Sequence, residues 1–428
     1  MDPNTKTLTA CLQTTKVPTE ALPVPDREAL ELGRRHTSGK ECVPMTITLG
    51  SLLQRLERDR DGDDLYSFFM PTAQGPCRFG VYHLLHKIVL ERLGYAGRVR
   101  VWSPHDSNYF AGVPKGFSVM AYTGFAAADL LQEMFYDVRP AERHSGEAAE
   151  IHRDAMAELN ERLETTGREG KLELVPALGE VASGKLFGCS ELLARTARIM
   201  AAIRRPVALP TVLVVGEIYV RCDAFANDFV IDRLEAQGVR VRFAPFTEWL
   251  EYVDYINARD GRTGGFGAWL SSRVQTRIQE HTYRTVARQL GWTPRTTVRD
   301  SLRAAAPYLR PELNGEAVLT LGGPLHEWHE RLIDGVLNVG PLECMPSKIA
   351  EAQFFHAAER EGLLSMTVSL NGDPIDPERL DGFVFEVKER FRRRSGSLVR
   401  RSPAALVPSL ADQPAADRPA PAVTAAAP

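Results

Sequence analysis

The pattern of apolar and polar positions predicts a parallel crossover in the first half of the chain. We expect a helix over residues 45–58, a strand over 65–70, a helix over 81–93 and a strand over 99–102. A strand, a helix and a second strand in this order are typical of a parallel β-α-β unit. The second helix has apolar residues at the spacing of one helical face, namely Val81, Leu84, Leu85, Ile88 and Val89.

The second half of the chain repeats this pattern with more continuous apolar strands. We expect strands over 211–219, 239–244, 336–339 and 364–370, and helices over 227–237, 346–361 and 376–394. Strands without polar alternation indicate a sheet that is buried on both faces. We therefore predict an α/β protein with two flavodoxin-like or Rossmann-like parallel-sheet domains that face a cleft.

Polar and Pro-rich segments mark the ends and the domain boundary. Residues 1–25 are rich in Thr and Pro, and residues 395–428 are dominated by Ala, Pro and Arg, so we expect both segments to be disordered. A break at residues 204–210 precedes the strongest apolar strand. It predicts a first α/β domain over 26–205 and a second over 206–394.

Composition and charge narrow the class of protein. The chain has 428 residues, of which 44% are hydrophobic, and this suffices for two cores. A net charge of -3 creates no field that would attract nucleic acid or an anionic membrane. The first residues contain no apolar segment of signal-peptide length, and nowhere do about eighteen apolar residues run together. We expect a cytoplasmic protein that binds neither nucleic acid nor membranes.

Three of the six cysteines share a local setting. Cys42, Cys77 and Cys344 each lie in a turn with Gly or Pro, directly before a predicted helix. The first turn of a helix offers unpaired N–H groups and a partial positive charge, which favour the thiolate that binds metals. The three cysteines are 35 and 267 residues apart, so a compact ribbon or a ferredoxin run is excluded. From spacing alone, an iron–sulfur cluster and simple burial are equally good interpretations.

The other cysteines have weaker signals. Cys11 falls in the segment expected to be disordered, and Cys189 precedes a helix that Ser190 can cap without a metal. We expect ordinary thiols at both positions. Cys222 follows the central strand, at the edge where open α/β sheets place ligands, and is a candidate fourth ligand or pocket residue.

Five motifs together resemble those of a known family. They are KECVP (40–44), GPCRFG (75–80), VGEIYVR (215–221), NVGPLECMPS (338–347) and GDPIDPE (372–378). They are similar to signatures of the 2-hydroxyacyl-CoA dehydratase and benzoyl-CoA reductase group. More narrowly, they resemble the 2-hydroxyglutaryl-CoA dehydratase D-component-like region of large CoA-enzyme activase proteins. The resemblance spans about residues 36–394.

The resemblance implies a 4Fe-4S cluster held by Cys42, Cys77 and Cys344, with one iron that lacks a cysteine ligand. In that group, the cluster receives a low-potential electron from an ATP-hydrolysing iron–sulfur activator and passes it to a CoA thioester. The chain has no Gly-rich Walker loop, so we expect ATP hydrolysis to need such a partner protein or domain. A homodimer or heterodimer is also compatible with the resemblance.

The catalytic role of this chain stays open at the level of sequence. It is either a dehydratase-like lyase or reductase-like component, or a non-catalytic relay or scaffold in such a system. A module without a cluster, in which the cysteines are only buried, is a third interpretation.

Four further residues are candidates for contacts with the cluster or a substrate, although none is assigned a catalytic step. Arg78 is adjacent to a proposed ligand, and Ser347 lies three residues after another. Glu217 and Arg221 follow the best strand, where a cleft would open, although they could equally form ion pairs.

Two other patterns have ordinary explanations. His326 and His329 are three residues apart, whereas the metalloprotease pattern needs four, so we expect a half-buried helix face. The basic run over residues 390–394 is expected to end the last helix and to complement its dipole.

Overall fold

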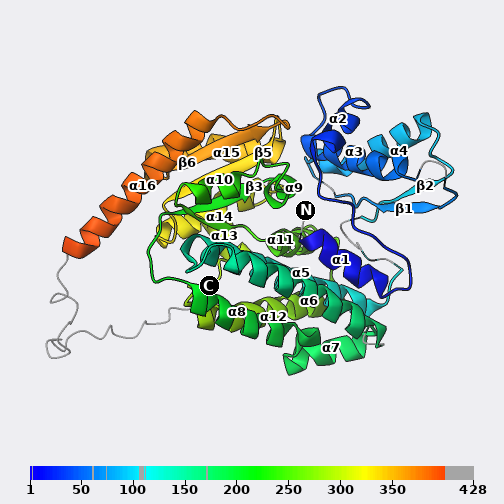
Figure 1. Cartoon of the computed structure of the whole chain (residues 1–428), viewed down its shortest axis with the longest axis horizontal. Coiled ribbons are helices and arrows are strands. Elements are labelled where there is room, and N and C mark those ends of the chain that lie inside the picture. The colour runs from blue at the N-terminus through cyan, green and yellow to red at the C-terminus, as the bar shows by residue number, and fades with distance from the viewer. Residues whose placement is uncertain are drawn as a thin grey trace, which may run out of the picture.

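The structure is a mixed α/β protein with two small parallel sheets among many helices (Figure 1). It is a computed structural model that describes residues 1, 3–59, 62–73, 75–105, 110, 112–169 and 172–400. Within these residues, no helix is both long and apolar enough to cross a membrane.

The first sheet has two parallel strands and belongs to a small α/β unit. Tyr66 pairs with Val99 in the register of the strands, and Phe69 pairs with Trp102. The crossover predicted for this block is therefore confirmed. Its elements are α2 (Arg27–Arg34), α3 (Val43–Glu57), β1 (Tyr66–Phe69), the 3-10 helix η1 (Arg78–Val81), α4 (Tyr82–Arg92) and β2 (Val99–Trp102).

The buried face of α4 differs from the predicted one. Val81, Leu84 and Ile88 are 47%, 47% and 46% exposed, whereas His86 and Val89 are buried. Because a two-stranded sheet is narrow, it covers only one side of the helix, and the packing of α3 decides which side that is.

The second sheet has four parallel strands in the order β4-β3-β5-β6. The two central strands are buried at every position, as their continuous apolar sequence predicts. Gly216 at the end of β3 pairs with Val339 of β5, so the carboxyl ends of these strands are adjacent. The strands are β3 (Thr211–Gly216), β4 (Arg240–Phe243), β5 (Gly335–Pro341) and β6 (Ser365–Leu370).

Helices cover both faces of the four-stranded sheet. Those that pack on one face are α10 (Val230–Ala236) and α16 (Pro377–Arg400). Those that pack on the other are α13 (Val298–Ala305), α14 (Ala317–His329) and α15 (Met345–Glu361). The connections also contain α9 (Ile218–Cys222) and α11 (Phe246–Arg259).

A helical unit replaces the second half of the predicted first domain. Residues 115–203 contain no strand within their described part and share one core with α1 and α12. Within the range 26–205, for which one α/β domain was predicted, the described strands therefore all precede residue 103, and the long amphipathic helices that follow bury their apolar faces against one another. The unit contains α1 (Asn4–Gln13), α5 (Lys115–Val138), η2 (Arg139–Ala141), α6 (Glu147–Arg168), α7 (Leu174–Ser183), η3 (Leu186–Gly188), α8 (Cys189–Ile203) and α12 (Gly265–Leu290).

The first residues of the chain are ordered, which corrects the prediction of disorder over 1–25. Helix α1 packs on α5 and α6, and Cys11 is fully buried between them. The polar side chains that suggested disorder have partners, since Thr7 donates to Asn160 Oδ1 over 3.1 Å and Thr9 donates to a carbonyl of its own helix. At the other end, α16 reaches Arg400, and residues 401–428 lie outside the described part.

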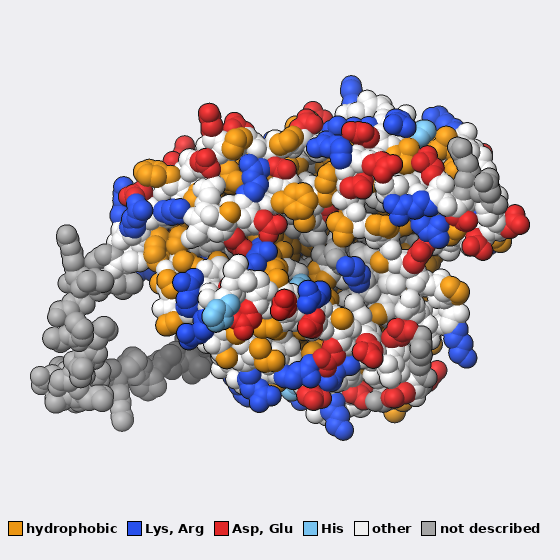
Figure 2. All heavy atoms as spheres, viewed as in Figure 1, with side chains coloured by type: hydrophobic (Ala, Val, Ile, Leu, Met, Phe, Trp, Pro, Cys, Tyr) orange, Lys and Arg blue, Asp and Glu red, His pale blue; other side chains and the backbone are white. Residues whose placement is uncertain are grey.

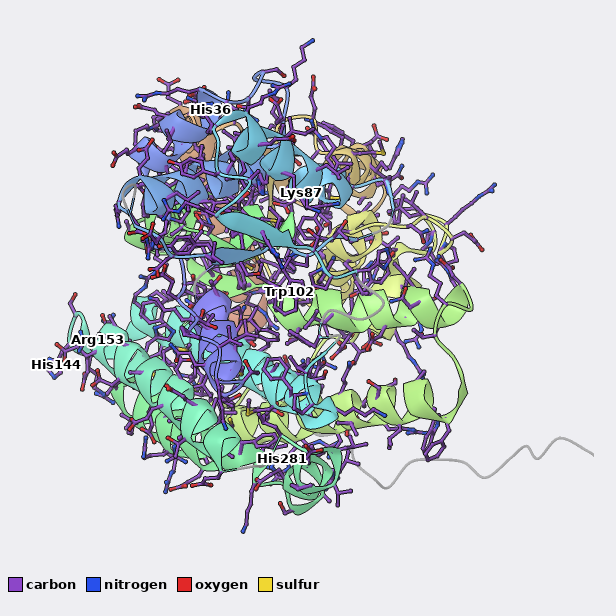
Figure 3. The ribbon with its side chains drawn as sticks, turned by 90° about the vertical axis from the view of Figure 1, so that its right-hand side faces the viewer. His36, Lys87, Trp102, His144, Arg153 and His281 are labelled. Atoms are coloured by element: carbon purple, nitrogen blue, oxygen red, sulfur yellow. The ribbon has the colours of Figure 1, made fainter. Side chains whose placement is uncertain are left out.

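The view in Figure 3 shows how the units are layered. His36 and Lys87 belong to the small α/β unit, and His144, Arg153 and His281 belong to the helical unit. Trp102, at the end of β2, lies between the two. The four-stranded sheet forms the remaining part of the molecule (Figure 1).

Candidate metal centre

Each of the three candidate ligands begins a helix. Cys42 is the N-cap of α3, Cys77 is the N-cap of η1, and Cys344 is the N-cap of α15. Prolines occupy the first turns of α3 and α15, where a missing N–H has no cost. The local setting predicted for the three cysteines is therefore confirmed.

Folding brings these distant cysteines together around one carboxylate. Cys77 interacts electrostatically with Cys42 and with Cys344. Glu217, at the start of α9, interacts with all three thiols. Cys42 and Cys344 are buried, whereas Cys77 is half-buried. The group contains one cysteine from each of three segments that are far apart in the sequence, and we call it the cysteine triad.

Arg78 ties the three cysteine loops to one another. It follows Cys77 and donates from Nη1 to the carbonyl oxygen of Lys40, 2.8 Å away. Its Nη2 donates to the carbonyl oxygens of Leu342 and Glu343, over 3.2 and 3.0 Å. A planar guanidinium can make these bonds simultaneously because its donors point in several fixed directions. The side chain thus links the loop before Cys42 with the loop before Cys344.

The carboxyl edge of the four-stranded sheet holds Glu217 in place. Its carboxylate accepts from the N–H groups of Tyr219 and Val220, over 3.1 and 2.9 Å, and so caps α9. Gly216 has φ +116°, and a Cβ there would lie 1.9 Å from the carbonyl oxygen of Val339. Only glycine therefore permits the close approach of β3 and β5 from which Glu217 projects.

Burial governs the protonation of the cysteine triad. It raises the pKa of Cys77 to about 12 and raises the pKa of Cys42 and of Cys344 above the usual value. Four groups oppose it by favouring the thiolates. The guanidinium of Arg78 and the hydroxyl of Tyr82 act on Cys42, and the N–H groups of Phe79 and Ser347 donate to Cys77 and Cys344. In the absence of a cation these thiols are protonated at neutral pH. A bound metal centre would supply the positive charge that holds them as thiolates.

The triad does not match the geometry of a single bound ion. Among the described residues, no three His, Cys, Asp or Glu side chains are placed to hold one metal ion. A tetrahedral zinc site needs its sulfurs packed around one atom, at about 2.3 Å from it.

A buried arginine and two further carboxylates lie behind Glu217. Arg221 is 1% exposed, donates to the carbonyl oxygen of Gly216 over 2.9 Å and forms a 3.5 Å ion pair with Glu316. Burial raises the pKa of Glu316 to about 8 and that of Glu248 to about 7. Arg221 therefore forms an ion pair with Glu316, and its charge opposes the effect of burial on the pKa of that carboxyl group.

The sequence pattern missed two residues of this site, Tyr82 and Glu316. The Tyr82 hydroxyl forms a hydrogen bond with the Cys42 side chain. Glu316 interacts electrostatically with Cys77 and Cys344. It follows Gly315, at which a Cβ would lie 3.5 Å from both Pro76 and Pro346. Tyr82 could have been found from its place just after the GPCRFG motif, but no local signal marks Glu316.

The remaining candidates have different surroundings. Ser347 is buried, and Asn338 Nδ2 approaches its hydroxyl at 3.4 Å, so it supports the loop of Cys344. Cys222 has Arg221, Asp129 and the Met1 ammonium as its strongest electrostatic neighbours, which places it at the edge of the site. Cys11 and Cys189 are buried and interact with each other in the core of the helical unit. The expected cap at Ser190 is wrong, because Gly188 is the N-cap of α8 and the Ser190 hydroxyl donates to the carbonyl oxygen of Gly184 over 2.6 Å.

Comparison with known proteins does not add an assignment. No family model matches the chain, and no curated protein or solved structure matches it.

Proposed function

We propose that Cys42, Cys77 and Cys344 bind an iron–sulfur cluster of the 4Fe-4S type and that the protein acts in low-potential electron transfer. The observation that carries the proposal is the convergence of three helix-capping cysteines, from distant segments, around Glu217. Burial alone does not require three thiols to meet at helix starts, where the backbone favours anions.

The surroundings of the triad suit an anionic inorganic centre. A cluster with thiolate ligands carries negative charge, and N–H groups directed at its sulfurs stabilise it and tune its potential. Phe79 and Ser347 supply such groups, and Arg78 supplies a positive charge beside Cys42. Three protein ligands would leave one iron of a 4Fe-4S cluster available to a further ligand.

The motif resemblance supports the same conclusion and extends it to a substrate class. Four of the five motifs contribute residues to the site or to the loops around it, although they span residues 40–347 of the sequence. The helices on both faces of the four-stranded sheet suit a flavodoxin-like second domain. We propose a CoA thioester as the substrate and an ATP-hydrolysing iron–sulfur activator as the electron donor.

Within this proposal, each protein group has a definite task. The bound centre would supply the one-electron chemistry. Arg78 holds the three loops in register through its contacts with main-chain carbonyl groups. Glu316 lies close enough to Cys77 and Cys344 for electrostatic interaction, and burial raises its pKa to about 8, so it can take up a proton when negative charge accumulates at the site.

The test is the metal content of the anaerobically purified or reconstituted protein. We expect about four iron and four sulfide per chain and a brown chromophore, as the assigned cluster type requires. Cys77→Ala should lose most of the iron, whereas Cys222→Ala, a change at the edge of the same site, should retain it. Absence of stoichiometric iron, or equal loss in both variants, would contradict the proposal and favour buried thiols.

A second measurement separates a catalytic component from a relay. If one iron is open to substrate, an acyl-CoA should change the EPR spectrum of the reduced protein. An unchanged spectrum with every thioester tried would favour the relay or scaffold, which is the alternative function of the same centre.

A further inference from the structure

A cavity of about 640 Å³ lies at the end of the four-stranded sheet opposite the cysteine triad. Ile333 and Leu364 are part of its wall, and they lie just before the amino ends of β5 and β6. Cys344 and Glu217 follow the carboxyl ends of β5 and β3, so this cavity is a separate place in the fold. The lining is completed by Arg331, Phe385, Glu386, Glu389, Arg390, Arg393 and Arg394, and we call the cavity the arginine groove.

The arginines over residues 390–394 do not lie at the end of the last helix, so stabilisation of the helix dipole does not explain them. The run over residues 390–394 was expected to end the last helix, but α16 continues to Arg400. Helix-dipole stabilisation falls off within the last turn. The dipole therefore does not explain the arginines that face the groove. Figure 2 shows Lys and Arg side chains along the outer edge of the molecule where α16 runs.

The positive charge of the groove is only partly neutralised. Arg394 pairs with the buried carboxylate of Asp334 over 3.2 Å. Glu389, which also lines the groove, pairs with Arg392, which is not part of the lining. Within the described part of the chain, no carboxylate forms an ion pair with Arg390 or Arg393. Three arginines of α16 thus face the groove: Asp334 pairs with Arg394 and also acts electrostatically on Arg390, whereas Arg393 has no ion pair within the described part of the chain.

Arg390 is held in a position from which it can meet a ligand. Its guanidinium lies 3.5 Å from the centroid of the Trp328 ring. Its Nε is buried, and among the described residues it has no hydrogen-bond partner. A buried donor without a partner is destabilising unless something accepts from it. Trp328 thus fixes the guanidinium of Arg390, whose Nε has no acceptor among the described residues.

The rest of the lining is apolar and offers an aromatic surface. Ile333 is buried, and Phe385 is 64% exposed at the groove. A flat apolar body can stack on an exposed ring, while guanidinium groups bind phosphate through paired hydrogen bonds. We propose that the arginine groove binds a nucleoside phosphate, with the phosphate on Arg390 and Arg393 and the ring on Phe385.

The binding test uses three probes that separate the two halves of such a ligand. Calorimetry on the whole chain would compare ADP, inorganic pyrophosphate and adenosine. We expect ADP to bind more tightly than pyrophosphate, and adenosine to bind too weakly to measure. The absence of ADP binding at millimolar concentration would overturn the proposal. If an acidic peptide bound while ADP did not, the groove would instead be a site for a protein partner.

Substitutions along α16 test whether ADP and pyrophosphate bind in the arginine groove. Arg393→Gln should weaken both ADP and pyrophosphate about tenfold, the loss of one charge-assisted hydrogen bond. Phe385→Ala should weaken ADP and leave pyrophosphate unchanged. Arg379→Gln, an exposed arginine of the same helix outside the lining, is the matched control and should change neither. All three positions are exposed, so the variants should fold, and circular dichroism checks this. Equal weakening in Arg379→Gln and Arg393→Gln would overturn the assignment.

Discussion

Arg78 Nη2 donates to the carbonyl oxygen of Glu343 over 3.0 Å, although 265 residues separate them in the sequence. Through this bond, and through its contact with Lys40, one side chain joins the segments that carry all three cysteines. The site therefore depends on tertiary contacts of Arg78 as much as on the thiols themselves.

The replacement of Arg78 should loosen the triad. In Arg78→Lys the positive charge remains, but a single ammonium cannot reach the carbonyl groups of both loops. We expect a lower iron content after reconstitution and faster loss of the chromophore in the presence of a chelator. Arg92→Lys, on the exposed end of α4, is the control and should behave as the wild type. Identical kinetics in the two variants would mean that Arg78 does not hold the site together.

The buried thiol in the helical core should affect stability and not the chromophore. Cys11→Ala removes a fully buried sulfur far from the triad in the fold, so we expect a loss of about 1 kcal/mol in the free energy of unfolding. Simultaneous replacement of Cys42, Cys77 and Cys344 by Ala should abolish the brown colour. Urea titration and the visible spectrum measure the two effects. A colourless Cys11→Ala protein would contradict the ligand assignment.

The contact between β3 and β5 makes Gly216 a sensitive position. Gly216→Ala adds a Cβ 1.9 Å from the carbonyl oxygen of Val339 at a backbone with φ +116°, so we expect a loss of about 3 kcal/mol. Gly238→Ala also has positive φ, but its Cβ would meet nothing within 4 Å, and it should cost about 1 kcal/mol. Chemical denaturation of both variants separates the clash from the backbone strain. Equal losses would show that the strands move apart easily.

His86 should make the protein less stable in acid. Its ring is fully buried, its Nε2 faces the carbonyl oxygen of Met45 at 3.2 Å, and its Nδ1 has no partner among the described residues. Burial lowers its pKa to about 4. Between pH 6.5 and pH 4 the unfolded state binds a proton that the folded state does not, so stability falls as the pH falls through this window.

The magnitude of this acid effect follows from the shift. A change of 2.5 pKa units corresponds to about 3 kcal/mol by pH 4. His86→Gln keeps a donor for Met45 and removes the titration, so its stability should depend less on pH in this window. His144→Gln changes an exposed histidine of the helical unit and should leave the wild-type dependence. Denaturation at pH 4 and pH 7 for the three proteins tests this. Parallel curves for wild type and His86→Gln would contradict the expectation.

The local patterns of the sequence were sufficient for most elements. Strand β2 lies over Val99–Trp102 as predicted, and α15 begins at Met345, directly after Cys344. Such elements follow from short-range properties, namely apolar periodicity and turn residues, that the chain carries wherever it folds. For the same reason, the helix starts at the three cysteines could be predicted from the sequence.

Other features depended on which segments pack together. The threonine-rich start of the chain gave no sign that Cys11 would be buried, because α5 and α6 provide its partners. No motif marked Glu316, since its meeting with Arg221 joins α9 to a loop 95 residues later. The sequence also did not show which face of α4 is exposed, because the narrow sheet and α3 decide which of its apolar side chains are covered.

The sequence by itself thus determined the central strands, the helix starts and the residue types available for chemistry. Only the tertiary structure decided that residues 115–203 form a separate helical unit, that Arg78 links the cysteine loops and that the arginines of α16 face a groove. The physical reason is range: a helix start depends on neighbouring residues, whereas burial, ion pairing and cavities depend on segments that meet only in the folded chain.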